Sequence, residues 1–223
     1  MRNKKVWDLE EFVRVVKPIV GKEEFENIRK YIDSLGWGGW RINYHIENYK
    51  KEMRKIRKIK IVNTKEDVKK FILQMKKCAE EVICIIQIQQ SILDILSQII
   101  NLVFLKPPLK EKEVSFNKIL CKKIEKRWQD KELFKKSREL KNSQEFKYIS
   151  AFSNVVKHHK LIKEHLRIDP YKSGLRFEGF EYKGEKYPKR FFEEIIESYI
   201  PSINDLIDEI GLLMNKKKSY YSK

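Results

Sequence analysis

The stretch TKEDVKKFILQMKKCAEEVICIIQIQQSILDILSQIINLVFL, residues 64–105, decides the fold. Its apolar residues form two series with a spacing of seven, which is the period of a packed helical seam. Thr64 and the acidic residues after it suit a helix start, and Pro107-Pro108 ends the pattern. Beyond residue 82 apolar side chains also lie outside the seam, so neighbours should pack on several sides. We predict one very long central helix in an antiparallel helical bundle.

The composition favours helices elsewhere too. Eight Gly and six Pro are few for 223 residues, which is typical of a mainly α protein. Residues 175–187 alternate apolar and polar side chains, shift phase at Gly179 and turn at Lys183-Gly184, which predicts a small β-hairpin. Other spacings predict helices at 8–20, 23–35, 41–61, 115–127, 131–141, 144–166 and 191–214, a turn at 36–40 and a kink at Pro201.

These elements suggest three parts along the chain. Residues 1–63 form an N-terminal helical extension whose third helix is basic. Residues 64–215 form the helical bundle and include the hairpin before the C-terminal helix. Residues 216–223 form a basic tail that we expect to be disordered.

Positive charge is the second global feature. Lys and Arg number 49 against 32 Asp and Glu, a formal charge of +17, which attracts polyanions and makes nucleic acid the default partner. The alternatives are lysine-rich helices that are simply solvated, or that contact anionic lipid. The densest run carries seven basic residues between positions 50 and 60 against one acid. Such a run is a solvated helix face, an RNA contact or a contact with anionic lipid. The predicted RNA-binding residues of this run are Lys50, Lys51, Arg54, Lys55, Arg57 and Lys58.

The cysteines and the apolar segments indicate a cytoplasmic protein. Three cysteines without a CxxC pair predict reduced thiols, and the first residues, MRNKKVWD, lack the apolar core of a signal peptide. The most apolar stretch, residues 82–105, contains four Gln, one Asp and one Asn, which a lipid-facing helix carries only at a cost. We therefore expect no membrane span.

Three of the four histidines lie within eight residues, and an imidazole titrates near neutral pH. On the predicted helix 144–166, His159 falls on the apolar face and is expected in the core, whereas Asn154, His158 and His165 share one flank. His158 and His165 are about 10 Å apart along such a helix, too far to share an ion. We expect no metal site, and the sequence has no Gly-x-Ser-x-Gly elbow or Gly-rich phosphate loop.

The stretch Ser153-Asn154-Val155-Val156-Lys157-His158 resembles the signature of the HEPN superfamily, which reads Arg, Asn, three variable residues and His on the last long core helix. The resemblance covers about residues 64–215. In its bundle and hairpin, the chain is similar to a clostridial-type HEPN subgroup. It implies a helical bundle without a cofactor that cuts RNA independently of metal, commonly across a homodimer interface. It also implies roles in toxin–antitoxin systems, with a cognate antitoxin or partner protein, or in phage defence.

The resemblance assigns a role to each matched residue. His158 would activate the ribose 2′-hydroxyl or stabilise the scissile phosphate, and Asn154 would hold His158 or the backbone in place. The family arginine is replaced by Ser153, which cannot neutralise a phosphorane. Lys157 is the candidate substitute, although an ammonium lacks the bidentate fork of arginine and projects from another side of the helix. The catalytic candidates are His158, Asn154 and Lys157, and His165 joins the RNA-binding set.

Three functions remain open at this point. The first is a metal-independent endoribonuclease, and the second is a catalytically degenerate HEPN module that binds RNA or a partner without cutting. The third is a helical protein-interaction domain in which the histidines are structural and the charge serves solubility.

Overall fold

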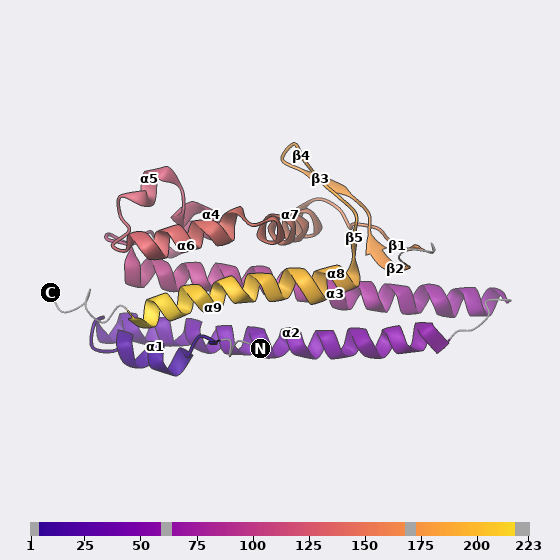
Figure 1. Cartoon of the computed structure of the whole chain (residues 1–223), viewed down its shortest axis with the longest axis horizontal. Coiled ribbons are helices and arrows are strands. Elements are labelled where there is room, and N and C mark those ends of the chain that lie inside the picture. The colour runs from indigo at the N-terminus through magenta and orange to yellow at the C-terminus, as the bar shows by residue number, and fades with distance from the viewer. Residues whose placement is uncertain (1–4, 59–63, 168–172, 217–223) are drawn as a thin grey trace. The chain divides into compact units, whose positions relative to one another are not determined.

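The computed structural model describes residues 5–58, 64–167 and 173–216 and confirms a mainly α protein with antiparallel strands before its C-terminal helix (Figure 1). The chain divides into two compact units. Unit 1 combines residues 1–38, 91–147 and 202–223, and unit 2 combines residues 39–90 and 148–201. Each unit is therefore assembled from segments that are distant in sequence. The predicted basic tail after residue 216 and the end of the predicted helix 41–61 lie outside the described residues.

The long helix predicted from residues 64–105 is confirmed as α3 (Lys65–Phe104). Thr64 caps it: the Asp67 N–H donates to Thr64 Oγ1 at 3.1 Å, and the Thr64 N–H donates to Asp67 Oδ2 at 3.1 Å. This reciprocal pair satisfies two backbone donors at the helix start. α3 is long and apolar enough to cross a membrane, and 56% of its most apolar window is buried inside the protein. The core helix of a soluble protein passes the same test, so the absence of a membrane span stays a prediction.

The turn predicted at residues 36–40 is wrong, because α2 (Lys22–Lys58) runs through it without a break. A helix that ended before Gly36 would use this glycine as a C-cap with a positive φ, but among the described residues only Lys183 and Gly184 have a positive φ. The burial pattern explains the continuity. Leu35 and Ile42 are both buried and lie seven residues apart, so one apolar seam continues across the glycines.

The remaining helices of unit 1 are short except for the last. The predicted helix 115–127 is divided by Cys121, which is extended (φ −78°, ψ 152°). The buried Trp128 indole N–H donates to the Ile119 carbonyl oxygen at 2.7 Å and satisfies the group that the break leaves open. The elements are α1 (Leu9–Val16), a 3-10 turn at Glu111–Glu113, α4 (Phe116–Ile119), α5 (Lys122–Glu125), α6 (Lys131–Asn142) and most of α9 (Ile200–Lys216).

Trp7 joins the start of the chain to α9 within unit 1. Its indole N–H donates to Asn215 Oδ1 at 3.2 Å, and Asn215 Nδ2 donates to the Asp8 carbonyl oxygen at 2.9 Å. The Trp7 ring lies directly over Gly211, where any side chain would overlap it. Gly211 is therefore required by a close approach and not by backbone conformation.

The helix predicted at 144–166 is too long, because α7 ends at His158. Residues Glu164–Arg167 form β1 instead, which pairs antiparallel with β2 (Gly174–Phe177). β2 also pairs with β5 (Arg190–Phe191), so the sheet order is β1-β2-β5. This pairing over sequence distance overrides the local helical spacing that residues 159–166 still show.

The predicted hairpin is confirmed as β3 (Phe180–Tyr182) and β4 (Glu185–Tyr187). Lys183 (φ 53°) and Gly184 (φ 80°) form its two-residue turn, which matches strand twist. The C-terminal helix continues from α8 (Phe192–Glu194) through a π-helical turn at Ile195–Tyr199 into α9. The predicted disturbance at Pro201 is this π turn, since proline cannot donate to the carbonyl four residues earlier.

Aromatic side chains form the core of unit 2. Tyr148 of α7 is 1% exposed, and its ring contacts those of Phe152, Phe180, Tyr187 and Tyr199 at centroid distances of 5.5–6.3 Å. Burial raises the pKa of the Tyr148 phenol and keeps it neutral. The core thus fixes α7 against the strands that follow it.

Candidate functional site

Ser153, which the resemblance aligns with the signature arginine, lies inside the core of unit 2. It is completely buried, and its hydroxyl has no hydrogen-bond partner among the described residues. The serine hydroxyl therefore does not reach the protein surface. At this position the chain presents a buried packing residue and no cation.

Asn154 follows on α7 and is half-buried. Its amide Nδ2 donates to the Ser150 carbonyl oxygen at 2.7 Å, one turn earlier on the same helix. This contact holds the side chain along the helix. The structure therefore gives Asn154 a fixed orientation, and its predicted role in positioning His158 stays a prediction.

His158 and Lys157 are both exposed at the end of α7. The His159 and Lys160 N–H groups both donate to the Val155 carbonyl oxygen, at 2.9 and 3.0 Å, and this closes the helix just after His158. An exposed imidazole can meet a ligand from solution. Cations here also complement the helix dipole, so a purely structural role accounts for the same placement.

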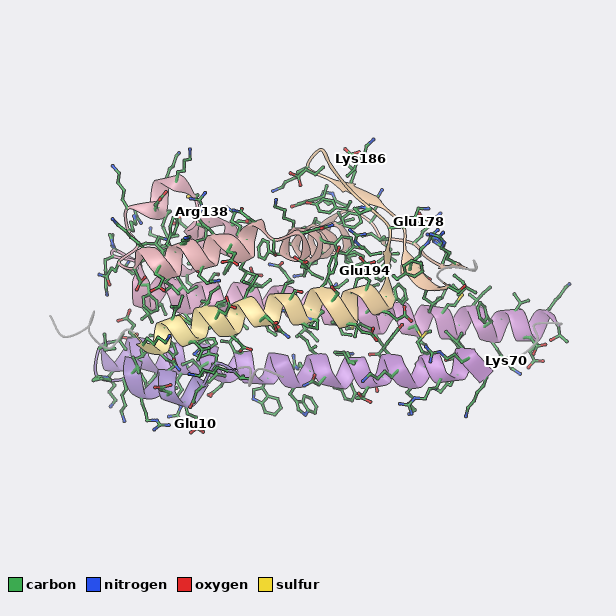
Figure 2. The ribbon with its side chains drawn as sticks, viewed as in Figure 1. Glu10, Lys70, Arg138, Glu178, Lys186 and Glu194 are labelled. Atoms are coloured by element: carbon green, nitrogen blue, oxygen red, sulfur yellow. The ribbon has the colours of Figure 1, made fainter. Side chains whose placement is uncertain are left out.

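The predicted core position of His159 is wrong. His159 is exposed, and its ring lies 6.2 Å from that of Tyr182 in β3. The prediction assumed that the helix continues through His159, whereas α7 ends at His158. The Lys183 ammonium Nζ lies over the Tyr182 ring, 5.2 Å from its centroid. Lys186 projects from the same hairpin (Figure 2).

His165 lies in β1 and not on the helix flank predicted for it. Its Nδ1 is 2.9 Å from Glu178 Oε1, and its Nε2 accepts from Arg176 Nε–H. Burial is the main cause that lowers the His165 pKa. The positive charges of Arg176 and Lys189 also lower this pKa, whereas the negative charge of Glu178 raises it. The imidazole is thus neutral at pH 7, with both nitrogens engaged, and an RNA contact by His165 stays a prediction.

Three residues of this network were missed by sequence reasoning: Arg176, Glu178 and Lys189. Lys189 Nζ lies 2.7 Å from Glu178 Oε2 and is the main cause that lowers the Glu178 pKa. The alternation of residues 175–178 places Arg176 of β2 and Glu178, which directly follows β2, on the same polar face. That signal was present in the sequence, but their histidine partner had been assigned to a helix.

The basic run of α2 is a surface. All six predicted RNA-binding residues between positions 50 and 58 are exposed. Two of them form ion pairs along the helix, Lys50 with Glu47 at 2.8 Å and Lys55 with Glu52 at 2.6 Å. On the other side of the helix Tyr49 and Ile56 are buried. The run is therefore a solvated face above a packed seam, with most of its charge unopposed.

A second basic surface borders a groove of about 900 Å³ in unit 1. Trp128 and Phe134 line it, with ring centroids 5.2 Å apart, and the Arg138 guanidinium on α6 lies 5.7 Å from the Phe134 centroid (Figure 2). Five cations outnumber two carboxylates, which suits an anion. The charged lining residues are Lys122, Lys126, Lys131, Lys135, Arg138, Glu125 and Glu139.

Other reactive side chains are shielded. Burial raises the pKa of the Cys78 thiol to about 12, so it is protonated and a poor nucleophile at neutral pH. His45 Nδ1 lies 2.6 Å from Glu81 Oε2 and both are mostly covered. Within the described ranges, no three His, Cys, Asp or Glu side chains gather as metal ligands.

Comparison with known proteins adds an independent observation. Residues 83–211 match the model of the Cthe2314-like HEPN family, and no curated protein or solved structure matches the chain. The matched range contains α7 with Asn154 and His158 and excludes the basic run of α2. Because the match extends over more than half of the 223 residues, the chain belongs to the HEPN superfamily.

Proposed function

We propose that this HEPN protein binds RNA. The observation that carries the proposal is the basic run of α2, where six exposed cations lie within nine residues. Within the described part of the chain, Lys50 and Lys55 form ion pairs, with Glu47 and Glu52. Such a surface neutralises phosphates and releases their counterions. The groove in unit 1 offers further cations to the same kind of ligand. Membership of the HEPN superfamily favours RNA among polyanions.

Salt dependence tests this proposal. In fluorescence anisotropy with single-stranded RNA and EDTA, replacing Lys51, Arg54 and Lys58 by Gln should weaken binding at least tenfold. It should also make the dependence on salt less steep: the slope of log K, where K is the association constant, against log salt should decrease in magnitude by about 2, since each phosphate contact contributes about 0.7. The matched control replaces the exposed Lys110, Lys112 and Lys118 by Gln, with the same change in net charge. Equal effects of the two triple variants would remove α2 as the RNA-binding surface.

A second candidate is metal-independent RNA cleavage at the end of α7, and the exposure of His158 favours it. In this reaction His158 takes the proton of a ribose 2′-hydroxyl, and the 2′-oxygen attacks the adjacent phosphorus. The P–O5′ bond breaks, and the leaving 5′-oxygen takes a proton from the His158 imidazolium or from water, so that a 2′,3′-cyclic phosphate and a 5′-hydroxyl form. Lys157 opposes the charge on the phosphorane, and Asn154 orients the site.

Cleavage is tested with RNA in EDTA. The His158→Ala variant should lose activity while the His159→Ala variant keeps it, because both imidazoles are exposed neighbours and only His158 occupies the signature position. Equal cleavage by wild type and His158→Ala would exclude His158 as the base. RNA binding without cleavage in wild type would leave a degenerate HEPN module, the alternative that a buried Ser153 supports.

Membership of the superfamily supports a proposal for the cellular setting. We propose a cytoplasmic protein of a toxin–antitoxin or phage-defence system that acts as a homodimer or with a cognate partner protein. Co-purification from the native host, with and without RNase treatment, tests this setting. A stable protein complex together with no affinity for RNA at physiological salt would favour the helical interaction domain instead.

A further inference from the structure

The outer side of α2 carries two aromatic side chains in line with its cations. We name this surface the outer stripe and define it by Trp40, Tyr44, Lys51, Arg54, Lys55 and Lys58. At 100° per residue, these six positions fall within an arc of about 100° on the helix surface. The alignment exists because α2 is helical at Trp40, where a turn was predicted from the sequence.

The outer stripe faces away from the core. Ile42, Tyr49 and Ile56 recur every seven residues on α2 and are 3%, 5% and 9% exposed. Their positions project to the opposite side of the helix from Trp40, Tyr44 and Lys51. Packing of unit 2 therefore does not account for the aromatic residues of the stripe.

The two aromatic rings are exposed and preorganised. Trp40 is 59% exposed and Tyr44 is 53% exposed. Their rings stack one helical turn apart, with centroids 5.8 Å and planes 16° apart, and the Tyr44 ring also contacts His45 edge-on at 5.4 Å. Large exposed aromatic surface marks an interaction site. Because the rings already hold each other in place, a ligand that stacks on them orders little further.

We propose that the outer stripe of α2 binds single-stranded RNA, with bases stacked on Trp40 and Tyr44 and phosphates on the cations toward Lys58. This inference rests on the proposed RNA binding and narrows its ligand to an unpaired strand. Aromatic platforms flanked by positive charge bind single strands because unpaired bases offer a free ring face. The stripe lies outside residues 83–211, so family membership does not assign it.

Charge decides between RNA and a protein partner. An apolar helix pair would continue along the stripe with more apolar residues, but Lys51, Arg54 and Lys58 follow the aromatic pair. The acid within the same arc, Glu47, is paired with Lys50 at 2.8 Å. An aromatic pair that leads into cations matches the alternation of base and phosphate in one strand.

The test measures binding by the full chain in the His158→Ala background, so that cleavage does not consume the probe. The probes are a fluorescent single-stranded RNA and its duplex, at salt concentrations between about 50 and 200 mM. Replacing Trp40 and Tyr44 together by Leu should weaken single-strand binding about tenfold to a hundredfold. The salt slope and the affinity for duplex should stay unchanged. Replacing both by Phe should retain most of the affinity, because Phe keeps a stacking face.

The outcomes separate the two proposals. If the Lys51, Arg54 and Lys58 variant loses affinity while the Leu variant keeps it, stacking is wrong and RNA binding stands. If wild type binds neither probe, RNA binding itself is wrong. If the Leu variant converts a dimer into a monomer in sedimentation velocity and keeps its RNA affinity, the stripe is a protein interface and the inference is overturned. Circular dichroism on the Leu and Phe variants verifies that both are folded.

Discussion

The end of α7 and the outer stripe of α2 differ in what identifies them and in what they offer a ligand. The α7 end carries the superfamily signature, yet its arginine position is a buried serine and its asparagine amide donates to its own helix. The outer stripe carries no signature and lies outside the family match. It nevertheless presents exposed cations and two exposed aromatic rings on one line.

This difference places the family signature and the proposed RNA-binding surface in separate parts of the chain. Phe152 and Val155 hold the signature helix α7 in the core of unit 2. The outer stripe of α2 supplies the surface with which RNA would be held. If α7 carries a cleavage site, that site lacks an arginine cation at Ser153. Binding of the RNA by a distant surface such as α2 would then help to position the reacting group.

The largest expected effect separates chemistry from binding. At saturating RNA, His158→Ala should lower the single-turnover cleavage rate by about 10²- to 10⁴-fold, the usual contribution of a general base, with the Kd unchanged. The outer-stripe triple variant with Lys51, Arg54 and Lys58 replaced by Gln should raise the Kd and leave the saturated rate as it was. If either variant changed both quantities together, the two regions would form a single site.

A smaller effect concerns the missing arginine. Ser153→Arg should lower the free energy of unfolding by about 3 kcal/mol without raising cleavage, because the new guanidinium enters a closely packed, buried position. Urea denaturation measures the change. The control, Ser153→Ala, should alter stability by less than about 1 kcal/mol, since it removes a hydroxyl that makes no hydrogen bond. A folded and more active arginine variant would show that the position reaches substrate after all.

The outer stripe can be stiffened without touching its ligand-binding residues. A Cβ added at Gly39 meets nothing within 4 Å, so Gly39→Ala should raise the free energy of unfolding by about 0.5–1 kcal/mol through helix propensity. Thermal denaturation measures the gain, and RNA affinity should not change. A loss of stability would show that the glycine backbone is needed in α2.

The smallest effect tests whether the His165 network is structural. Because burial and the nearby cations lower the His165 pKa below its ordinary 6.5, the unfolded chain binds more protons as the pH falls through that value. Stability therefore decreases below about pH 6.5 and is retained above it. Partial exposure keeps the effect small. In NMR titration, Arg176→Gln should raise the His165 midpoint, and an unchanged midpoint would exclude Arg176 as a cause.

Local signals in the sequence predicted much of the fold. The Thr64 cap, the long helix α3 and the Lys183-Gly184 turn each depend on residues close in sequence, and all three are confirmed. The seam of α3 is buried from Cys78 onward, whereas its first member, Val68, is 43% exposed. Failures occurred where distant contacts decide. β1 exists because it pairs with β2, so His165 could not be placed from helical spacing alone. Gly36 resembles a helix end unless the burial of Ile42 beyond it is known.

The candidate site was predictable to the extent that it follows a motif. Asn154 and His158 could be proposed because they keep the spacing of the motif, and their roles stay predictions. Trp40 and Tyr44 were missed because the first was assigned to a turn and the second to a separate helix. Only an unbroken α2 brings both into phase with Lys51 and Lys58.

The hydrogen bond between Trp7 and Asn215 fixes the order in which parts of unit 1 can fold during synthesis. Their hydrogen bond joins residues 208 positions apart, so a nascent chain cannot seat Trp7 until α9 has left the ribosome. Until then Gly211 is not available to receive the indole, and the first segment of unit 1 has an uncovered apolar face. Chains that stop before α9 should consequently be recognised by chaperones and proteases as incomplete. In this protein α9 therefore determines when the segment that carries Trp7 can complete its packing.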